Sequence, residues 1–348
     1  MPHAMSTERP APVPVTVLTG FLGAGKTTVL NRLLRRPQLT RTAVLVNEVG
    51  AIPIDHHLVK DVPGGTVVLG SGCVCCTVSG DLVRALAELH GQAARGEVPG
   101  FDRVLVETTG LADPTGVLAT LVQHPLIARA YRPSAVVTVV DGEVGVATLA
   151  RHREAVAQVA LADRVLVSKI DRDGVDPAAV EAVVRGLNRS ATVVRVAGGD
   201  VEPDVLLAEA AVERQVAAAI DGDPHAHEHD HGHDGEHEHV HVHGDVRTFS
   251  VVLDQPVRMG PLGLWLSLMT QMHGGALLRV KGLVAVEGEA APVVVHAVQH
   301  VVYPARQLEA WPDGDHRTRL VFIARGLGTG TIASLRHSLA ETLGQPLR

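Results

Sequence analysis

The sequence is poor in aromatic residues, cysteine and lysine, and each scarcity limits what the protein can be. Phe, Tyr and Trp make up only 2% of its 348 residues, so Val, Leu, Ala and Ile must supply the cores. The three cysteines all lie between positions 73 and 76, which excludes a disulfide framework and suits a reducing cytosol. Lysine occurs four times, and two of these lysines lie in the nucleotide-binding motifs described below.

Other absences limit the partners and the location. No apolar run is long enough to span a bilayer, and residues 1–12 lack the apolar segment of a secretory signal. The formal net charge of −7 argues against nucleic acid as the main partner. We therefore expect a cytoplasmic protein with neither a membrane nor a nucleic-acid partner. Residues 1–12 are expected to form a disordered tail.

A glycine-rich stretch near the start carries the clearest motif. An apolar strand is expected over residues 13–19, a helix over 26–36, and the span from Gly20 to Thr27 fits G-x-x-x-x-G-K-[ST]. In such a loop backbone N–H groups surround the phosphates, the lysine reaches the β- and γ-phosphates, and the hydroxyl ligates Mg²⁺. The residues expected to bind the nucleotide here are Gly20, Gly23, Ala24, Gly25, Lys26, Thr27 and Thr28.

Two further strands are expected to end in carboxylates. Residues 43–47 lead into Glu48, and the strand over residues 104–107 ends at Glu107, which is followed by Thr-Thr-Gly. A carboxylate at the end of the second strand is the expected partner of Mg²⁺, and the N–H of Gly110 is expected near the γ-phosphate. Glu48 and Asp113 are the candidates for orienting the attacking water.

The tetrapeptide Ser168-Lys169-Ile170-Asp171 follows another buried strand and is similar to the guanine-reading N-K-x-D of GTP-binding proteins. The Asp171 carboxylate can accept hydrogen bonds from the N1–H and exocyclic amine of guanine, a donor pair that adenine lacks. The Lys169 stem can pack on the base, while Ser168 replaces the usual Asn. These three residues complete the predicted GTP site.

The order of elements indicates the fold. Strands alternate with helices to about residue 200, which predicts an α/β fold of P-loop NTPase type with a mostly parallel sheet and ligands at the carboxyl ends of its strands. A helix is expected over 203–220. Strands without regular helices between them then predict a smaller C-terminal α+β domain. We divide the chain into a GTPase domain at 13–222, a His-rich linker at 223–244 and a C-terminal domain at 245–348.

The linker and two later histidines are possible metal ligands. Nine histidines and five acidic residues lie between positions 225 and 243 without apolar periodicity, which predicts a low-complexity loop that collects Zn²⁺, Ni²⁺, Co²⁺ or Cu²⁺ weakly. A solvated linker is the alternative. His296 and His300 are expected on one face of a strand over 293–302, in an ordinary structural role or as metal contacts. The linker histidines are His225, His227, His229, His231, His233, His237, His239, His241 and His243.

Three thiols within four residues, at Cys73, Cys75 and Cys76, can converge on one soft or borderline metal ion. The segment must turn for all three to bind, and water, Glu48 or a histidine can provide a fourth ligand. Small buried hydrophobic residues or a redox thiol are the alternative. Because the cluster lies between Glu48 and Glu107, nucleotide state and metal affinity can be coupled by a loop rearrangement.

The combined motifs resemble the CobW family of P-loop GTPases, over nearly the whole chain after residue 12. The matching segments are residues 20–28, Asn47-Glu48, 72–77, 107–114, 168–171, the His-rich linker, and Leu278-Arg279-Val280-Lys281-Gly282 followed by Trp311. The resemblance implies GTP hydrolysis coupled to delivery of Zn²⁺ or Co²⁺ to a client metalloprotein. It also implies that the three thiols are the transfer site and that Glu48 ligates the transferred metal or lies near Mg²⁺.

The sequence departs from the family pattern at one motif, and two alternative functions are considered. The family often has Asn-Glu-Phe-Gly-Glu after the second strand, whereas Val49 and Ala51 stand here at the third and fifth positions. The first alternative is a non-enzymatic metal buffer that relies on the histidine tract, and the second is an accessory GTPase for nickel insertion. The metal, the client and the oligomeric state stay open, including a homodimer that depends on nucleotide or metal.

Overall fold

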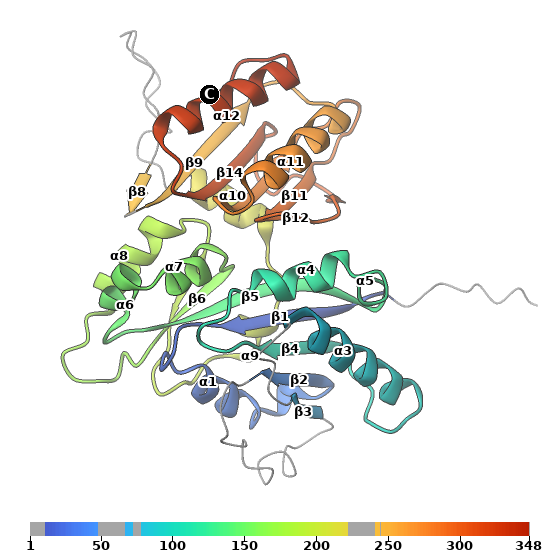
Figure 1. The fold of residues 1–348 in the computed structure, drawn as a ribbon, viewed down its shortest axis with the longest axis vertical. Coiled ribbons are helices and arrows are strands. Elements are labelled where there is room, and N and C mark those ends of the chain that lie inside the picture. The colour runs from blue at the N-terminus through green and yellow to red at the C-terminus, as the bar shows by residue number, and fades with distance from the viewer. Residues whose placement is uncertain (1–10, 48–66, 72–77, 222–240, 244, 348) are drawn as a thin grey trace, which may run out of the picture.

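The computed structural model describes residues 11–47, 67–71, 78–221, 241–243 and 245–347. The segments expected to contain the amino-terminal tail, Glu48, the three cysteines and most of the histidine tract therefore lie outside the described residues. Two sheets, one after the other along the chain, organise what is described (Figure 1). Within the described helices, none combines the length and the apolar character that crossing a membrane requires.

The first sheet has seven strands in the order β3-β2-β4-β1-β5-β6-β7, and every neighbouring pair is parallel. This confirms the predicted P-loop NTPase fold. Helices α3 and α4 cover one face of the sheet, and α1 and α9 cover the other. The elements of this part are β1 Val13–Thr19, α1 Lys26–Leu33, η1 Pro37–Leu39, β2 Thr42–Asn47, β3 Val67–Ser71, α3 Val78–Ala94, β4 Arg103–Glu107, α4 Thr115–Gln123, α5 Ile127–Ala130, β5 Tyr131–Asp141, α6 Gly145–Arg151, α7 Arg153–Ala160, β6 Arg164–Ser168, α8 Pro177–Leu187, β7 Thr192–Arg195, α9 Pro203–Leu207 and α10 Val212–Asp221.

The second sheet is antiparallel, with the order β12-β11-β10-β14-β9-β8, and β13 pairs with β11. Helices α11 and α12 pack on one face, while α10 packs on the other (Figure 1). Helices α7 and α8 of the first part contribute to the same core as Leu278 and Ile323 of this sheet. The elements are β8 His241–His243, β9 Val246–Leu253, α11 Met259–His273, β10 Leu277–Val284, β11 Val293–Val298, β12 Val301–Val302, β13 Arg306–Gln307, β14 Thr318–Arg325 and α12 Thr329–Leu343.

Two expected elements are interrupted. The helix expected over 203–220 is two helices, because the Ala210 N–H donates to the Ser134 carbonyl at 3.1 Å and Arg164 donates to the carbonyls of Ala208 and Glu209. The strand expected over 293–302 is a hairpin that turns at Gln299 and His300.

The hairpin corrects the prediction for the two histidines. His296 lies on β11, where its ring stacks on that of Tyr303 with centroids 4.2 Å apart, and burial holds the pKa of His296 well below its usual value. His300 lies in the turn and is exposed. The two residues therefore do not share a face of one strand. At the end of the histidine tract, residues 241–243 form β8 beside β9, which corrects the expected loop there: the alternation His-Val-His has the period of a strand.

A buried ionic cluster joins the two sheets. Asp163, the residue before β6, is 2% exposed, and its carboxylate accepts hydrogen bonds from the Lys281 ammonium at 2.9 Å and from the Arg279 guanidinium. Arg279 also donates to the Leu161 carbonyl, and Lys281 donates to Gln215 of α10. Burial alone would raise the pKa of Asp163, but the two cations outweigh it and hold that pKa below its usual value. Residues 279 and 281, part of the motif noted above, thus anchor the second domain to the first.

Candidate functional site

The glycine-rich loop lies between the end of β1 and the start of α1, at the carboxyl edge of the parallel sheet. Gly20 has φ +141°, and a Cβ there would lie 2.3 Å from the Val139 carbonyl oxygen of β5, so only glycine fits. Gly25 has φ +99° and precedes the first turn of α1. Lys26 is 9% exposed, and its ammonium donates to the Gly20 carbonyl at 2.8 Å. The loop thus curls around the lysine.

Glu107 ends β4, which lies next to β1 in the sheet, with Glu107 in register with Leu18. The Thr27 hydroxyl donates to Oε1 of Glu107 at 3.1 Å, although 80 positions separate the two residues. Glu107 is 4% exposed, so this carboxylate is held inside the protein against the start of α1. A hydroxyl and a carboxylate oxygen are hard donors of the kind that Mg²⁺ prefers, so the pair fits the predicted cation.

The loop from Glu107 to α4 lies against the glycine-rich loop. A Cβ on Gly110 would come within 2.6 Å of the Leu22 backbone nitrogen, so the two loops approach too closely for any side chain there. The side chain of Gln158, on α7 and fully buried, donates to the carbonyls of Gly110 at 3.1 Å and Ala112 at 3.0 Å. Sequence reasoning missed Gln158, because nothing near it in the chain resembles a motif.

Asp113 takes part in two hydrogen bonds. Its Oδ1 accepts from the Thr115 N–H at 2.9 Å, in the first turn of α4, and its Oδ2 accepts from the Gln299 side chain at 3.0 Å. Gln299 belongs to the turn between β11 and β12, so this carboxylate joins the loop after Glu107 to the second domain. Each carboxylate oxygen accepts one hydrogen bond from the protein, so Asp113 helps to position the loop.

The segment expected to read guanine follows β6. The Ser168 hydroxyl donates to the Ala24 carbonyl at 2.6 Å, which ties this segment to the glycine-rich loop. Lys169 has φ +57°, unusual for a residue with a side chain, and its ammonium pairs with Asp141 at the end of β5. Burial alone would raise the pKa of Asp141, but hydrogen bonds from Lys169 and from two backbone N–H groups lower it.

A second loop that the motif search missed lies beside Asp171. The Gly198 N–H donates to the Asp171 carboxylate at 2.9 Å and lowers its pKa. At Gly199, φ is +78° and a Cβ would come within 2.8 Å of Thr28, so this loop also packs against the start of α1. The Gly-Gly pair shortly after β7 is the sequence signal that could have indicated this loop. The loop thus links the expected base-reading segment to the expected phosphate-binding segment.

These residues follow three parallel strands and meet at one edge of the sheet. β1 leads into Lys26 and Thr27, β4 ends at Glu107, and β6 is followed by Asp171. For Glu48 and the thiols, only flanking elements are described: β2 ends at Asn47, β3 ends at Ser71 and α3 begins at Val78. Among the described residues there is no group of three or more His, Cys, Asp and Glu side chains suited to a metal ion.

Comparison with protein-family models decides the relationship. Residues 14–195 match the CobW/HypB/UreG nucleotide-binding domain, and residues 246–343 match the cobalamin synthesis protein cobW C-terminal domain. The chain belongs to the CobW family. The match to the first model covers the parallel sheet and all the motif residues described above, and the match to the second covers the antiparallel sheet from β9 to α12.

Relatives within the CobW family match over most of their length. The chain is 30% identical to the zinc chaperone YjiA of Escherichia coli over 312 residues, which cover 90% of this chain and 94% of YjiA. It is 33% identical to the zinc chaperone CobW of Pseudomonas aeruginosa, over 97% of this chain and 96% of that protein. The crystal structure of Zn(II)-bound YjiA GTPase aligns with a TM-score of 0.67 at 25% identity, covering 94% of this chain and 99% of that one.

Proposed function

We propose that this CobW-family protein is a GTPase that carries a transition metal, zinc before cobalt, and delivers it to a client metalloprotein. One observation carries the nucleotide half of the proposal: the 3.1 Å contact from Thr27 to Glu107, which brings two distant motifs together where a P-loop enzyme needs them. Family membership and the two zinc chaperones that match over nearly their whole length support the metal half.

In the proposed nucleotide complex, the backbone from Gly20 to Thr28 surrounds the phosphates. The Lys26 ammonium, which donates to the Gly20 carbonyl here, turns to the β- and γ-phosphates. Thr27 and Glu107 hold Mg²⁺, which when bound neutralises charge on the phosphate oxygens. Gly110 has no side chain and lies against Leu22 of the glycine-rich loop. Its N–H is therefore proposed to approach the γ-phosphate bound by that loop.

Guanine is the proposed base. Asp171 is exposed, and its carboxylate has a lowered pKa, so it is ionised and able to accept from the two donors of guanine. Lys169, whose ammonium pairs with Asp141, is proposed to pack its stem on the base. Glu48 and Asp113 are the proposed candidates for the group that orients the attacking water, and Asp113 also accepts from Thr115 and Gln299.

The metal is cargo in this scheme, and we propose that Cys73, Cys75 and Cys76 hold it, with Glu48 as a further ligand. The thiols follow β3 and Glu48 follows β2, two adjacent parallel strands whose carboxyl ends share an edge of the sheet with the glycine-rich loop. Thiolates suit a borderline ion that must be released again. The histidine tract from 225 to 243 supplies weak sites that raise the local metal concentration.

Changing Cys75 to alanine is expected to abolish tight Zn²⁺ binding in the GTP-bound state and to leave GTP binding within about threefold of the unchanged protein, since a thiolate is lost and no phosphate contact is. Competition against a chromogenic zinc chelator measures the first quantity, and calorimetric titration with a non-hydrolysable GTP analogue measures the second. A zinc affinity equal to that of the unchanged protein would refute the assignment of the thiols.

A further inference from the structure

The turn between β11 and β12 has an unusual backbone. Gln299 has φ +48°, a left-handed conformation that costs a residue with a side chain free energy and that turns normally assign to Gly, Asn or Asp. The Gln299 N–H donates to the Leu278 carbonyl of β10 at 3.1 Å, which holds the turn in place. Unfavourable backbone conformations persist where the surroundings impose them, often at functional contacts. The contacts of this turn therefore matter.

On one side the turn contacts the nucleotide-binding domain. The Gln299 amide donates to Oδ2 of Asp113 at 3.0 Å, while Oδ1 of the same carboxylate accepts from the first turn of α4. Asp113 ends the loop that begins at Glu107 and packs through Gly110 against the glycine-rich loop. Only three positions separate Gly110 from Asp113, the residue that binds Gln299. A shift of Gly110 can therefore move the Asp113 carboxylate and, through it, Gln299.

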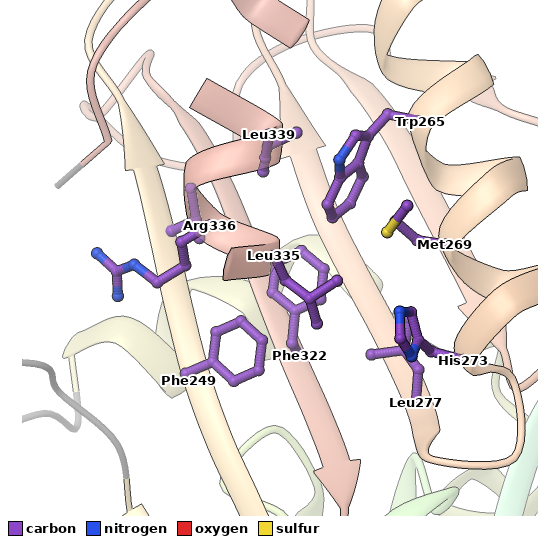
Figure 2. A pocket seen from close by; sticks show the side chains of 10 residues that line it. Phe249, Trp265, Met269, His273, Leu277, Phe322, Leu335, Arg336 and Leu339 are labelled. Carbon is purple, nitrogen blue, oxygen red and sulfur yellow. The ribbon is translucent and has the colours of Figure 1, made fainter. Parts of the chain in front are cut away.

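On the other side the turn contacts the end of α11. A Cβ on Gly274, the residue after this helix, would lie 3.1 Å from the His300 backbone nitrogen, so the turn and the helix end are in direct contact. The last turns of α11 carry Met269 and His273, which line an apolar pocket with Trp265 between α11, α12 and the sheet (Figure 2). The turn therefore lies between the expected γ-phosphate loop and the helix that forms this pocket.

We propose that Gln299 is a positioning residue that couples the nucleotide state of the first domain to helix α11 of the second. Contact of Gly110 with the γ-phosphate shifts the loop, the Asp113 carboxylate moves with it, and the turn at Gln299 and His300 transmits the change to the end of α11. The coupling is reciprocal, so a ligand that moves α11 alters the affinity for GTP by the same factor. This inference rests on the proposed GTP binding but requires nothing of the metal site.

The tryptophans allow a direct test, because both of them, Trp265 and Trp311, lie in the second domain. In a Trp311→Phe background, Trp265 is the only tryptophan, 5% exposed in the apolar pocket. If its emission differs between the GDP complex and the complex with a non-hydrolysable GTP analogue, a structural change must have been transmitted from the first domain to the second. We expect such a change in the Trp311→Phe protein and its loss when Gln299→Leu is added, with the affinity for the GTP analogue lowered by about 5-fold or more.

Gln307→Leu is the matched control, since Gln307 on β13 also donates its amide to a carboxylate, Glu289, at 2.8 Å, but away from the loop. It should retain the emission change. Calorimetric titration of each variant with GDP and with the GTP analogue distinguishes a loss of coupling from a loss of nucleotide binding. If the Trp311→Phe protein binds both nucleotides without an emission change, or if Gln299→Leu keeps the change, the coupling role is wrong while the GTPase proposal stands. If the protein does not bind GTP, the proposed function fails, and this inference fails with it.

Discussion

Replacing Asp163 with asparagine is expected to lower the free energy of unfolding by about 3–5 kcal/mol, because the change leaves the buried Arg279 cation, and the protonated fraction of Lys281, without their counter-ion. Arg279 and Lys281 are each 1% exposed, so water cannot take the place of the lost charge. Chemical denaturation followed by tryptophan emission measures the loss in the second domain. Separation of one transition into two would show that the domains had come apart.

Exposed pairs provide the control for this prediction. The Arg41–Asp102 ion pair, with side chains 61% and 51% exposed, also joins two segments distant in the chain. Asp102→Asn should change stability by less than about 1 kcal/mol. The double variant Asp163→Asn with Lys281→Met removes the buried amine that has lost its partner and should recover part of the loss. A single Asp163→Asn variant as stable as Asp102→Asn would contradict the anchoring role of the cluster.

The same cluster predicts how stability depends on pH. Burial, together with Arg279, lowers the pKa of Lys281 to about 7, whereas an unfolded lysine titrates near 10.4. Between these values the unfolded chain binds more protons than the folded one, so the contribution of Lys281 makes stability rise with pH across that window. The lowered pKa of Asp163 acts at acid pH: its stabilisation is complete above the unfolded value and is lost as pH falls toward the folded one.

Replacing Lys26 with alanine is expected to lower the rate of GTP hydrolysis by about 10²–10³-fold, the effect of losing one preorganised positive donor at developing negative charge. The lysine is 9% exposed and held inside its loop, so a neighbouring cation cannot substitute for it. Release of inorganic phosphate under single-turnover conditions measures the chemical step without product release.

Arg84→Ala is the control for Lys26, since the Arg84 side chain is 75% exposed on α3 and pairs with Asp81 in the same helix. This variant should hydrolyse GTP at the unchanged rate. Circular dichroism of Lys26→Ala should match that of the unchanged protein, because the lost contacts are hydrogen bonds to loop carbonyls. A Lys26→Ala protein that retains its hydrolysis rate would exclude the glycine-rich loop as the reacting site.

The predictable part of the fold is the part with local signals. Apolar runs that lead into a glycine, a carboxylate or Ser-Lys-x-Asp predicted β1, β4 and β6, and parallel topology places the residues that follow them at one edge. Gly20, Gly25 and Gly110 could be predicted because a phosphate-binding loop needs positive φ or close backbone approach, and glycine allows both. The sequence therefore predicted which edge of the sheet these residues share, while their role in nucleotide binding stays a prediction.

The unpredicted features depend on contacts between distant segments. Gln299 is not a usual turn residue, so the left-handed turn that separates β11 from β12 had no signal, and His296 and His300 were wrongly given one face. The break between α9 and α10 comes from hydrogen bonds to Ser134 and Arg164, which override the helical preference of the alanines there. Gln158 likewise has its role only through the loop that it supports.

The proposed function makes nucleotide state the determinant of metal affinity, and competitive zinc titration of the purified protein tests this most directly. The titration is run once with Mg²⁺ and a non-hydrolysable GTP analogue, and once with Mg²⁺ and GDP, with a chelator of known affinity reporting free zinc. We expect the tight site to differ between the two states by at least about 5-fold, the lower end of typical coupling between sites. Equal zinc affinity in the two nucleotide states would contradict the account.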